Sequence, residues 1–170
     1  EPAGPFRHLA AHNLALAGLT EGDTTRRVMV DIVSASYFDV LGAPPALGRT
    51  FTPQEERPGG DGFVAIASHS TWARAGLAAD FLGRTVVLNG RRFTLIGVAP
   101  RGFGGTTVVM EPDYYLPLAA HDVMEWELVA GNRKSLDRRD YHRLLVIGRL
   151  RPGLTTEAAD RELAPIARRL

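Results

Sequence analysis

The stretch from Val33 to Pro53 constrains the fold of this chain more than any other. The apolar run Val28–Val33 leads into it and is predicted to be a strand, and residues 37–41 are predicted to form a short helical turn. Gly42 supplies the left-handed residue that ends a helix, and the Pro44-Pro45 pair prevents the helix from restarting. The backbone is therefore expected to bend sharply here.

Large apolar side chains gather around this bend, which predicts a buried structural corner. Ser36 is positioned as the N-cap of the turn, and Asp39 follows at the spacing of a capping box. The apolar residues of the corner are Tyr37, Phe38, Leu41, Leu47 and Phe51. None of them is a chemically reactive side chain, so the corner has no predicted catalytic role.

The bulk properties indicate one domain, or two closely packed subdomains. A chain of 170 residues buries roughly 70% of its unfolded surface. Its net charge of +1 provides no global attraction to nucleic acid or to anionic lipid. It has no cysteine, which excludes disulfides and thiolate metal sites. No run approaches the ~18–20 apolar residues of a membrane span, and because the chain begins at Glu1 we expect it to be part of a longer protein.

Residues 6–19 have apolar positions spaced more like a helix than a strand, so a helix is predicted there. His8 and His12 would share one face of that helix at i and i+4, a spacing that can chelate a metal. No HExxH glutamate or third ligand accompanies them. We therefore interpret this face as solvated and predict no metal site.

The clearest local signal lies between Gly83 and Pro100. Two β-rich runs flank the dipeptide Asn89-Gly90, which supplies positive φ at both central positions of a type I′ turn. A β-hairpin is predicted. Further strands are expected at 63–67, 113–118 and 144–150, the last of them buried on at least one face, and helices at 68–76, 119–129 and 155–170. Residues 54–62 and 132–140 are predicted loops.

The candidate catalytic residues do not have the spacing that a known catalytic motif requires. Ser68, His69 and Asp61 suggest a hydrolase, but the chain contains no GxSxG elbow, and adjacent residues on an extended segment point to opposite faces. A serine hydrolase is therefore the last-ranked alternative. No catalytic residue and no cofactor is predicted.

The glycine-rich run Arg101–Thr107 resembles a phosphate-binding loop only superficially. No GK[ST] follows the glycines, and a β-like run rather than a helix comes next. We predict instead a flexible or contact-making loop, with Phe103, Gly104 and Gly105 as candidate partner contacts. No aromatic stacking platform is interleaved with the loop charges of the basic segment 133–151, so we interpret it as a solvated loop beside a strand and not as a nucleic-acid site.

Several motifs, in order, resemble the extracytoplasmic core domain of MacB/FtsX-type ABC transporter permeases, and most closely the duplicated orphan permeases of acidobacteria. The opening motif is Ser36–Gly42 followed by Leu47–Pro53. The residues that we assign to its structural motif are Tyr37, Phe38, Gly42, Gly48, Arg49, Asn89 and Gly90. Other matching segments are 64–68 with Trp72, 83–86 with 88–90, 96–100 with Gly102 and Phe103, 113–118 and 148–155.

The resemblance implies an α+β fold in which a porter-like mixed α/β subdomain, residues 1–50 plus 141–170, carries a smaller β-rich inserted subdomain, residues 51–140. It implies a place outside the cytoplasmic membrane, on the periplasmic side, anchored by transmembrane helices of the parent chain. It also implies a separate cytoplasmic ATPase, a periplasmic adaptor or substrate, and a dimeric parent. A strand that precedes Phe6 in the family is expected to be missing here.

We therefore expect a non-enzymatic domain that transmits conformational change and contacts partners for an ABC-type permease. The alternative from another class is a module that senses a small molecule or peptide in a cleft between its two subdomains.

Overall fold

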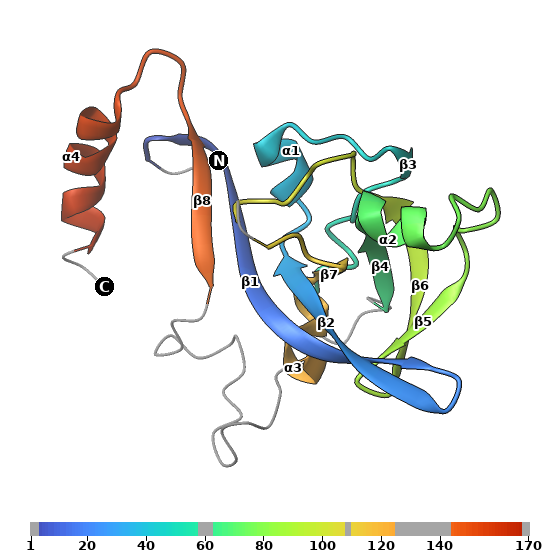
Figure 1. Cartoon of the computed structure of the whole chain (residues 1–170). Helices are drawn as coiled ribbons and strands as arrows, with labels where there is room; N and C mark the ends of the chain where they lie inside the picture. The colour runs from blue at the N-terminus through green and yellow to red at the C-terminus, as the bar shows by residue number, and fades with distance from the viewer. Residues whose placement is uncertain (1–3, 58–62, 108–109, 125–143, 168–170) are drawn as a thin grey trace.

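The computed structural model describes residues 4–57, 63–107, 110–124 and 144–167 (Figure 1). Helices and strands are both present, which confirms the α+β class. In chain order the elements are β1 Phe6–Glu21, β2 Thr24–Val33, α1 Tyr37–Leu41, β3 Leu47–Gly48, β4 Val64–Ala67, α2 His69–Arg74, β5 Thr85–Leu88, β6 Arg91–Val98, β7 Tyr114–Pro117, the 3₁₀ turn η1 Leu118–Ala120, α3 His121–Met124, β8 Leu145–Leu150 and α4 Thr156–Ala167. No helix in the described ranges is long and apolar enough to cross a membrane. The loop predicted at 132–140 lies outside them.

Six of the strands close into a ring. The hydrogen-bonded order runs β1, β2, β7, β4, β6, β5 and back to β1. The β2–β7 and β4–β6 pairs are parallel, and the other pairs are antiparallel. Two strands lie outside this ring: β3 pairs with the end of β6, and β8 pairs with the first half of β1. Closure leaves few unpaired strand edges in the barrel.

Alternation along the barrel strands produces two cores, one on each side of the sheet. Residues that point into the barrel include Val30, Ile32, Ala65, Ala67, Phe93, Leu95, Tyr114 and Leu116. The second core lies on the outer side under α1 and includes Val33, Tyr37, Phe38, Val40, Phe51, Ile66 and Tyr115. Because successive strand residues face opposite sides, a short strand such as β7 serves both cores.

The helix predicted over residues 6–19 is wrong, because this segment is the long strand β1. β1 pairs with β2 along one edge, and with β8 and β5 along the other, so tertiary pairing overrides the weak helical spacing. Even-numbered Ala10 and His12 face the second core, whereas odd-numbered Ala17 and Leu19 face the barrel interior. The solvated histidine face is wrong as well: His8 is exposed, but His12 is 1% exposed.

The other predicted elements largely agree with the structure. Asn89 and Gly90 have φ values of 48° and 74° at the tip of the β5–β6 hairpin, which is confirmed. Ser68 caps α2 by accepting a hydrogen bond from the Thr71 amide at 3.1 Å. Trp72 on that helix is only half-buried.

At the corner, the bend is confirmed but its predicted cap is not. α1 ends at Gly42 with φ 67°, as expected. Ser36 makes no side-chain cap hydrogen bond, and its hydroxyl instead donates to the Leu9 carbonyl oxygen at 2.7 Å. The capping-box spacing was therefore misleading: this serine fastens the corner to β1.

Gly48 and Arg49 fix the position of the chain that follows the bend. Arg49 donates hydrogen bonds of 2.9 and 2.7 Å to the two carboxylate oxygens of Glu55, and this ion pair lowers the pKa of Glu55. Gly48 has φ +74°, and a Cβ there would lie 2.2 Å from the Ile96 carbonyl oxygen. Only glycine allows β3 to approach β6 so closely.

β8 is present as predicted, but it is less buried than expected. Leu145 and Val146 are 62% and 65% exposed, because β8 is an edge strand that pairs only with β1 within the described part of the chain. Arg149 connects β8 to the corner by donating from Nε and Nη2 to the Val40 carbonyl oxygen, at 3.2 and 2.7 Å. α4 follows, with the Thr155 hydroxyl capping it through the Ala158 amide at 3.3 Å.

Strands from 1–50 and 145–150 share one hydrogen-bonded sheet with strands from 51–140. The division of the chain into a porter-like part and an inserted part stays a prediction.

The close approach at Gly48 predicts a specific loss of stability. Gly48→Ala should destabilise the chain by at least about 3 kcal/mol, because it combines left-handed strain with a backbone collision. The matched control is Gly22→Ala, at φ +62° with no heavy atom within 4 Å of the added Cβ, which should cost only about 1–2 kcal/mol. Urea unfolding measures both values, and equal losses would contradict the close-approach argument.

Candidate functional site

Four residues from separate segments form a closed ring of hydrogen bonds, which we call the buried polar ring. His12 Nδ1 lies 3.0 Å from Asp31 Oδ1, and the Tyr37 hydroxyl donates to Asp31 Oδ2 at 3.0 Å. The Thr106 amide donates to the Tyr37 hydroxyl at 3.3 Å, and Thr106 Oγ1 lies 2.9 Å from His12 Nε2. His12, Asp31 and Tyr37 are all at most 1% exposed. The ring thereby joins β1, β2, α1 and the glycine loop, residues 101–107.

The β1–β2 register places His12 beside Asp31. His12 is opposite Val33 and Asp31 is opposite Leu14, so the two side chains are diagonal neighbours on one face. The carboxylate can only accept, so His12 Nδ1 carries the proton of their hydrogen bond. Burial, together with the nearby Asp31 charge, raises the pKa of Tyr37, which keeps its hydroxyl protonated as a donor.

The predicted partner-contact residues belong to the glycine loop, next to Thr106 of the ring. Phe103 is half-buried, with its ring centroid 5.4 Å from Phe38 and 5.7 Å from Tyr115, and its carbonyl oxygen accepts from the Tyr115 hydroxyl at 3.0 Å. Gly105 has φ +69°, and a Cβ there would lie 2.4 Å from the Tyr37 hydroxyl oxygen. Gly104 is half-buried beside it. Contacts with Tyr37 and Tyr115 therefore anchor the loop to the second core. Its role in partner contact stays a prediction.

Asp31, His12 and Thr106 have the order of an acid, a base and a nucleophile. The Thr106 amide, however, donates inward to Tyr37, and the cavity described below is lined by none of these residues. A nucleophile needs a substrate space and donors for an oxyanion beside it. We interpret the ring as an anchor for the loop.

The residues of the hydrolase alternative do not form a site in the described part of the chain. The Ser68 hydroxyl bonds to Thr71 at 3.1 Å as part of its cap, and the His69 ring lies against Trp72 with centroids 5.6 Å apart. Asp61 lies outside the described residues. Within those residues, no three His, Asp or Glu side chains lie close enough together to hold a metal ion.

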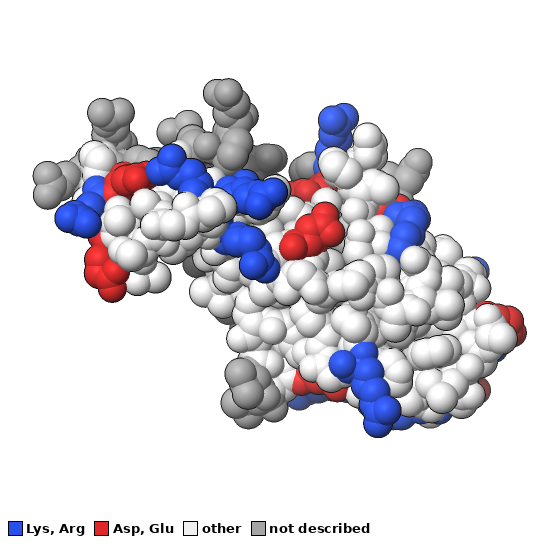
Figure 2. All heavy atoms as spheres, turned by 90° about the horizontal axis from the view of Figure 1, so that it is seen from above, with Lys and Arg blue, Asp and Glu red and all other residues white. Residues whose placement is uncertain are grey.

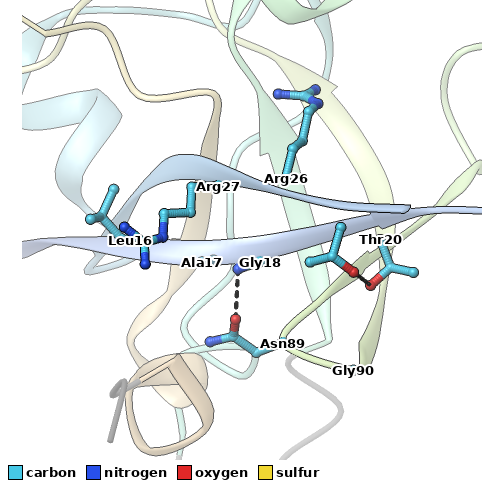
Figure 3. A pocket seen from close by; sticks show the side chains of 9 residues that line it. Leu16, Ala17, Gly18, Thr20, Arg26, Arg27, Asn89 and Gly90 are labelled. Carbon is cyan, nitrogen blue, oxygen red and sulfur yellow. Dashed lines mark hydrogen bonds between the residues drawn. The ribbon is translucent and has the colours of Figure 1, made fainter. Parts of the chain in front are cut away.

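A cavity of about 430 Å³ lies where the β1–β2 hairpin meets the Asn89-Gly90 turn (Figure 3). Gly18 forms part of its lining, and the Gly18 amide donates to Asn89 Oδ1 at 2.7 Å. Arg26 and Arg27 of β2 also line it. Asn89 and Gly90, which the sequence marks as a turn, thus lie at a cavity as well.

Figure 2 shows no large single-signed surface on the face it presents, because basic and acidic residues are interspersed near α4 and most of the face is uncharged. Arg151 there pairs with Glu162 at 2.8 Å. Most of the predicted basic segment, residues 133–143, lies outside the described residues.

Comparisons with known proteins agree with the resemblance seen in the motifs. The sequence matches the family described as "MacB-like periplasmic core domain" over residues 5–166. No curated protein matches the chain.

Three solved structures have the same fold. The periplasmic region of MacB from Actinobacillus actinomycetemcomitans is similar with a TM-score of 0.70 and 16% identity, covering 99% of this chain and 69% of that one. A domain of a putative permease protein from Porphyromonas gingivalis has a TM-score of 0.63 and 20% identity, covering 99% and 66%. The extracellular domain of the noncanonic ABC-type transporter YknZ from Gram-positive bacteria has a TM-score of 0.55 and 17% identity, covering 72% and 60%. This chain therefore spans about two thirds of the length of these structures.

The contact between Gly105 and the polar ring predicts a non-additive pair of substitutions. Gly105→Ala should destabilise more than Gly102→Ala, because both residues have positive φ but only the first Cβ meets the Tyr37 hydroxyl. Tyr37→Phe removes that oxygen, so the double variant Tyr37→Phe/Gly105→Ala should lose about 1 kcal/mol less than the sum of the single losses. Denaturant unfolding of the four proteins tests this, and strictly additive losses would show that the loop does not rest on Tyr37.

Proposed function

The chain belongs to the MacB-like periplasmic core domain family, and on that premise we propose that it is a non-enzymatic extracytoplasmic domain of an ABC-type permease that transmits conformational change to partners. The match over residues 5–166 is the observation that carries this proposal. Within the family, we propose membership of the duplicated orphan permeases of acidobacteria, which is supported by the motif residues Ser36–Gly42 and Leu47–Pro53.

The proposed partners follow from this role. Transmembrane helices of the parent chain hold the domain on the periplasmic face of the inner membrane, and a separate cytoplasmic ATPase drives the parent. The parent is dimeric, and the domain contacts a periplasmic adaptor or substrate through the glycine loop. We also retain the proposed division into residues 1–50 plus 141–170 and residues 51–140.

A continuous set of contacts supports a transmitting role. Arg149 on the edge strand β8 donates two hydrogen bonds to the Val40 carbonyl oxygen of α1. α1 also carries Tyr37, whose hydroxyl accepts from the Thr106 amide in the glycine loop. A displacement of β8 would therefore act on α1 and then on the loop, while the closed barrel keeps its own geometry.

Ligand sensing is the second candidate function. The cavity near Gly18 favours it, because residues from both proposed subdomains line that cavity. It lies at the barrel's hairpin turn and not at the polar ring, so the two functions are separable by experiment.

The transmitting role predicts an ATP-dependent change in the glycine loop. In the full-length parent reconstituted with its ATPase, hydrogen exchange of the segment 101–107 should differ with and without ATP. Segment 85–98, which contains β5 and β6, should not change because it belongs to the closed barrel. Hydrogen exchange measured by mass spectrometry with and without ATP tests this. Equal exchange of segment 101–107 in both states would contradict the transmitting role.

The contact route also predicts an effect of Arg149 in the isolated chain. Arg149→Gln should speed exchange of the Thr106 amide about fivefold, a change typical of a coupling residue. The control is Arg151→Gln, which removes an ion pair to Glu162 on α4 without touching α1. The Leu95 amide, bonded within the barrel to the Arg84 carbonyl at 2.8 Å, reports global unfolding. Equal Thr106 exchange in both variants would contradict the route.

A further inference from the structure

Three residues of the buried polar ring place the hydroxyl of an exposed threonine against a buried base. Asp31 and His12 are each 1% exposed, whereas Thr106 is exposed on the glycine loop. His12 Nδ1 lies 3.0 Å from Asp31 Oδ1 and carries the proton of that hydrogen bond, because the carboxylate can only accept. In the neutral imidazole, Nε2 is then the acceptor for the Thr106 hydroxyl, whose oxygen lies 2.9 Å away.

Tyr37 completes this arrangement by fixing the orientation of the carboxylate. Its hydroxyl donates to Asp31 Oδ2 at 3.0 Å, so each carboxylate oxygen has a donor and the group is held beside His12. The rings of His12 and Tyr37 also lie against each other, with their centroids 5.3 Å apart. A base that is oriented by a third group and bonded to a hydroxyl is the arrangement that activates a weak hydroxyl nucleophile.

The glycine loop also supplies backbone donors next to Thr106. Within the described part of the chain, the amides of Gly104 and Gly105 donate to no other residue. Gly105 has φ +69°, a left-handed conformation of the kind that builds anion-binding concavities from successive amides. Such donors stabilise the negative oxygen that forms when a hydroxyl attacks an acyl group. Because the cavity described above lies elsewhere, we expect a single transfer to Thr106 and no turnover.

We propose that Thr106 is a covalent modification site that accepts an acyl group from an activated ester. Thr106 Oγ1 forms a bond to the ester carbonyl carbon while its proton passes to His12 Nε2. The bond between that carbon and the leaving alcohol then breaks, and the alcohol takes the proton from His12. The acylated oxygen can no longer donate to His12, so the modification removes one hydrogen bond that holds the glycine loop. This site goes beyond the transmitting role and does not depend on it.

p-Nitrophenyl acetate is a suitable probe, and fragment spectra of peptides from the full chain locate the acetyl group. Thr106 should be acetylated about 100-fold faster than Thr107, a factor that a positioned general base supplies. Thr107 is the matched comparison because its hydroxyl bonds to no other described residue. Equal rates at the two threonines in the folded chain would overturn the proposal.

Two histidine variants test the base. His12→Gln should slow acetylation of Thr106 about 100-fold, because an amide can replace the hydrogen bonds of the imidazole but cannot take the proton. The control His8→Gln changes an exposed histidine of the same strand and should leave the rate at Thr106 unchanged. Circular dichroism checks that both variants are folded. Equal rates at Thr106 in the two folded variants would overturn the proposal.

A comparison in concentrated urea requires no variant, and it decides the matter if His12→Gln does not fold. Unfolding separates His12 from Thr106, so the preference for Thr106 over Thr107 should disappear. Thr106→Ser keeps the hydroxyl and should be acetylated in the folded chain at least as fast as Thr106. A preference that persists in urea, or a serine variant that does not react, contradicts activation by the ring. Either result leaves the transmitting role untouched, because that role is tested by hydrogen exchange.

Discussion

The Asp31 carboxylate is the group on which the arrangement of the second core depends. It is 1% exposed on β2, between Val30 and Ile32, which face the barrel interior. An unpaired charge at such a place would cost several kcal/mol, so the fold must bring donors to it. His12 comes from β1 and Tyr37 from α1, and Thr106 then connects these two donors. The sharp corner after β2 is what returns Tyr37 to the carboxylate.

The two cores divide the mechanical roles between them. The barrel is closed by hydrogen bonds between all six of its strands and is filled by apolar side chains, so it resists local opening. The second core contains the polar ring and is covered by a five-residue helix and a glycine loop, which have few backbone hydrogen bonds of their own. Changes of position are therefore easier in the second core than in the barrel. Its parts are nevertheless joined by directional bonds, so they are expected to move together.

Local chemistry allowed the sequence to predict some parts of the fold and not others. Asn89-Gly90 and Gly42 were predicted correctly because positive φ is a property of single residues. β1 was not, because its strand conformation comes from pairing with β2, β5 and β8, and alternation of Ala10, His12, Ala17 and Leu19 between two cores obscures its period. Ser36 had the right spacing for a cap, but a tertiary acceptor on β1 took its hydroxyl.

The polar ring was missed for the same reason. His12 and Asp31 are 19 residues apart, and only the β1–β2 register brings them together. One local signal was present: Asp31 is a lone charge inside the apolar run Val28–Val33, and such a charge needs a partner wherever the strand is buried on both faces. Nothing in the sequence near Thr106 indicates that its hydroxyl and amide complete the ring.

β1 connects the polar ring to the Gly18 cavity in a way that restricts how the two could communicate. His12 and Gly18 are separated by an even number of residues, so they lie on the same face of the strand, about 20 Å apart along its axis. That distance exceeds the Debye length of about 8–10 Å at ordinary salt, so direct attraction between charges at the two places is largely screened. β1 is also paired with β2 along the whole interval between them, which prevents the strand from bending independently. Any coupling between the cavity and the ring must therefore be a displacement of the β1–β2 pair as one unit, carrying His12 and Asp31 together while Tyr37 and Thr106 follow through their hydrogen bonds.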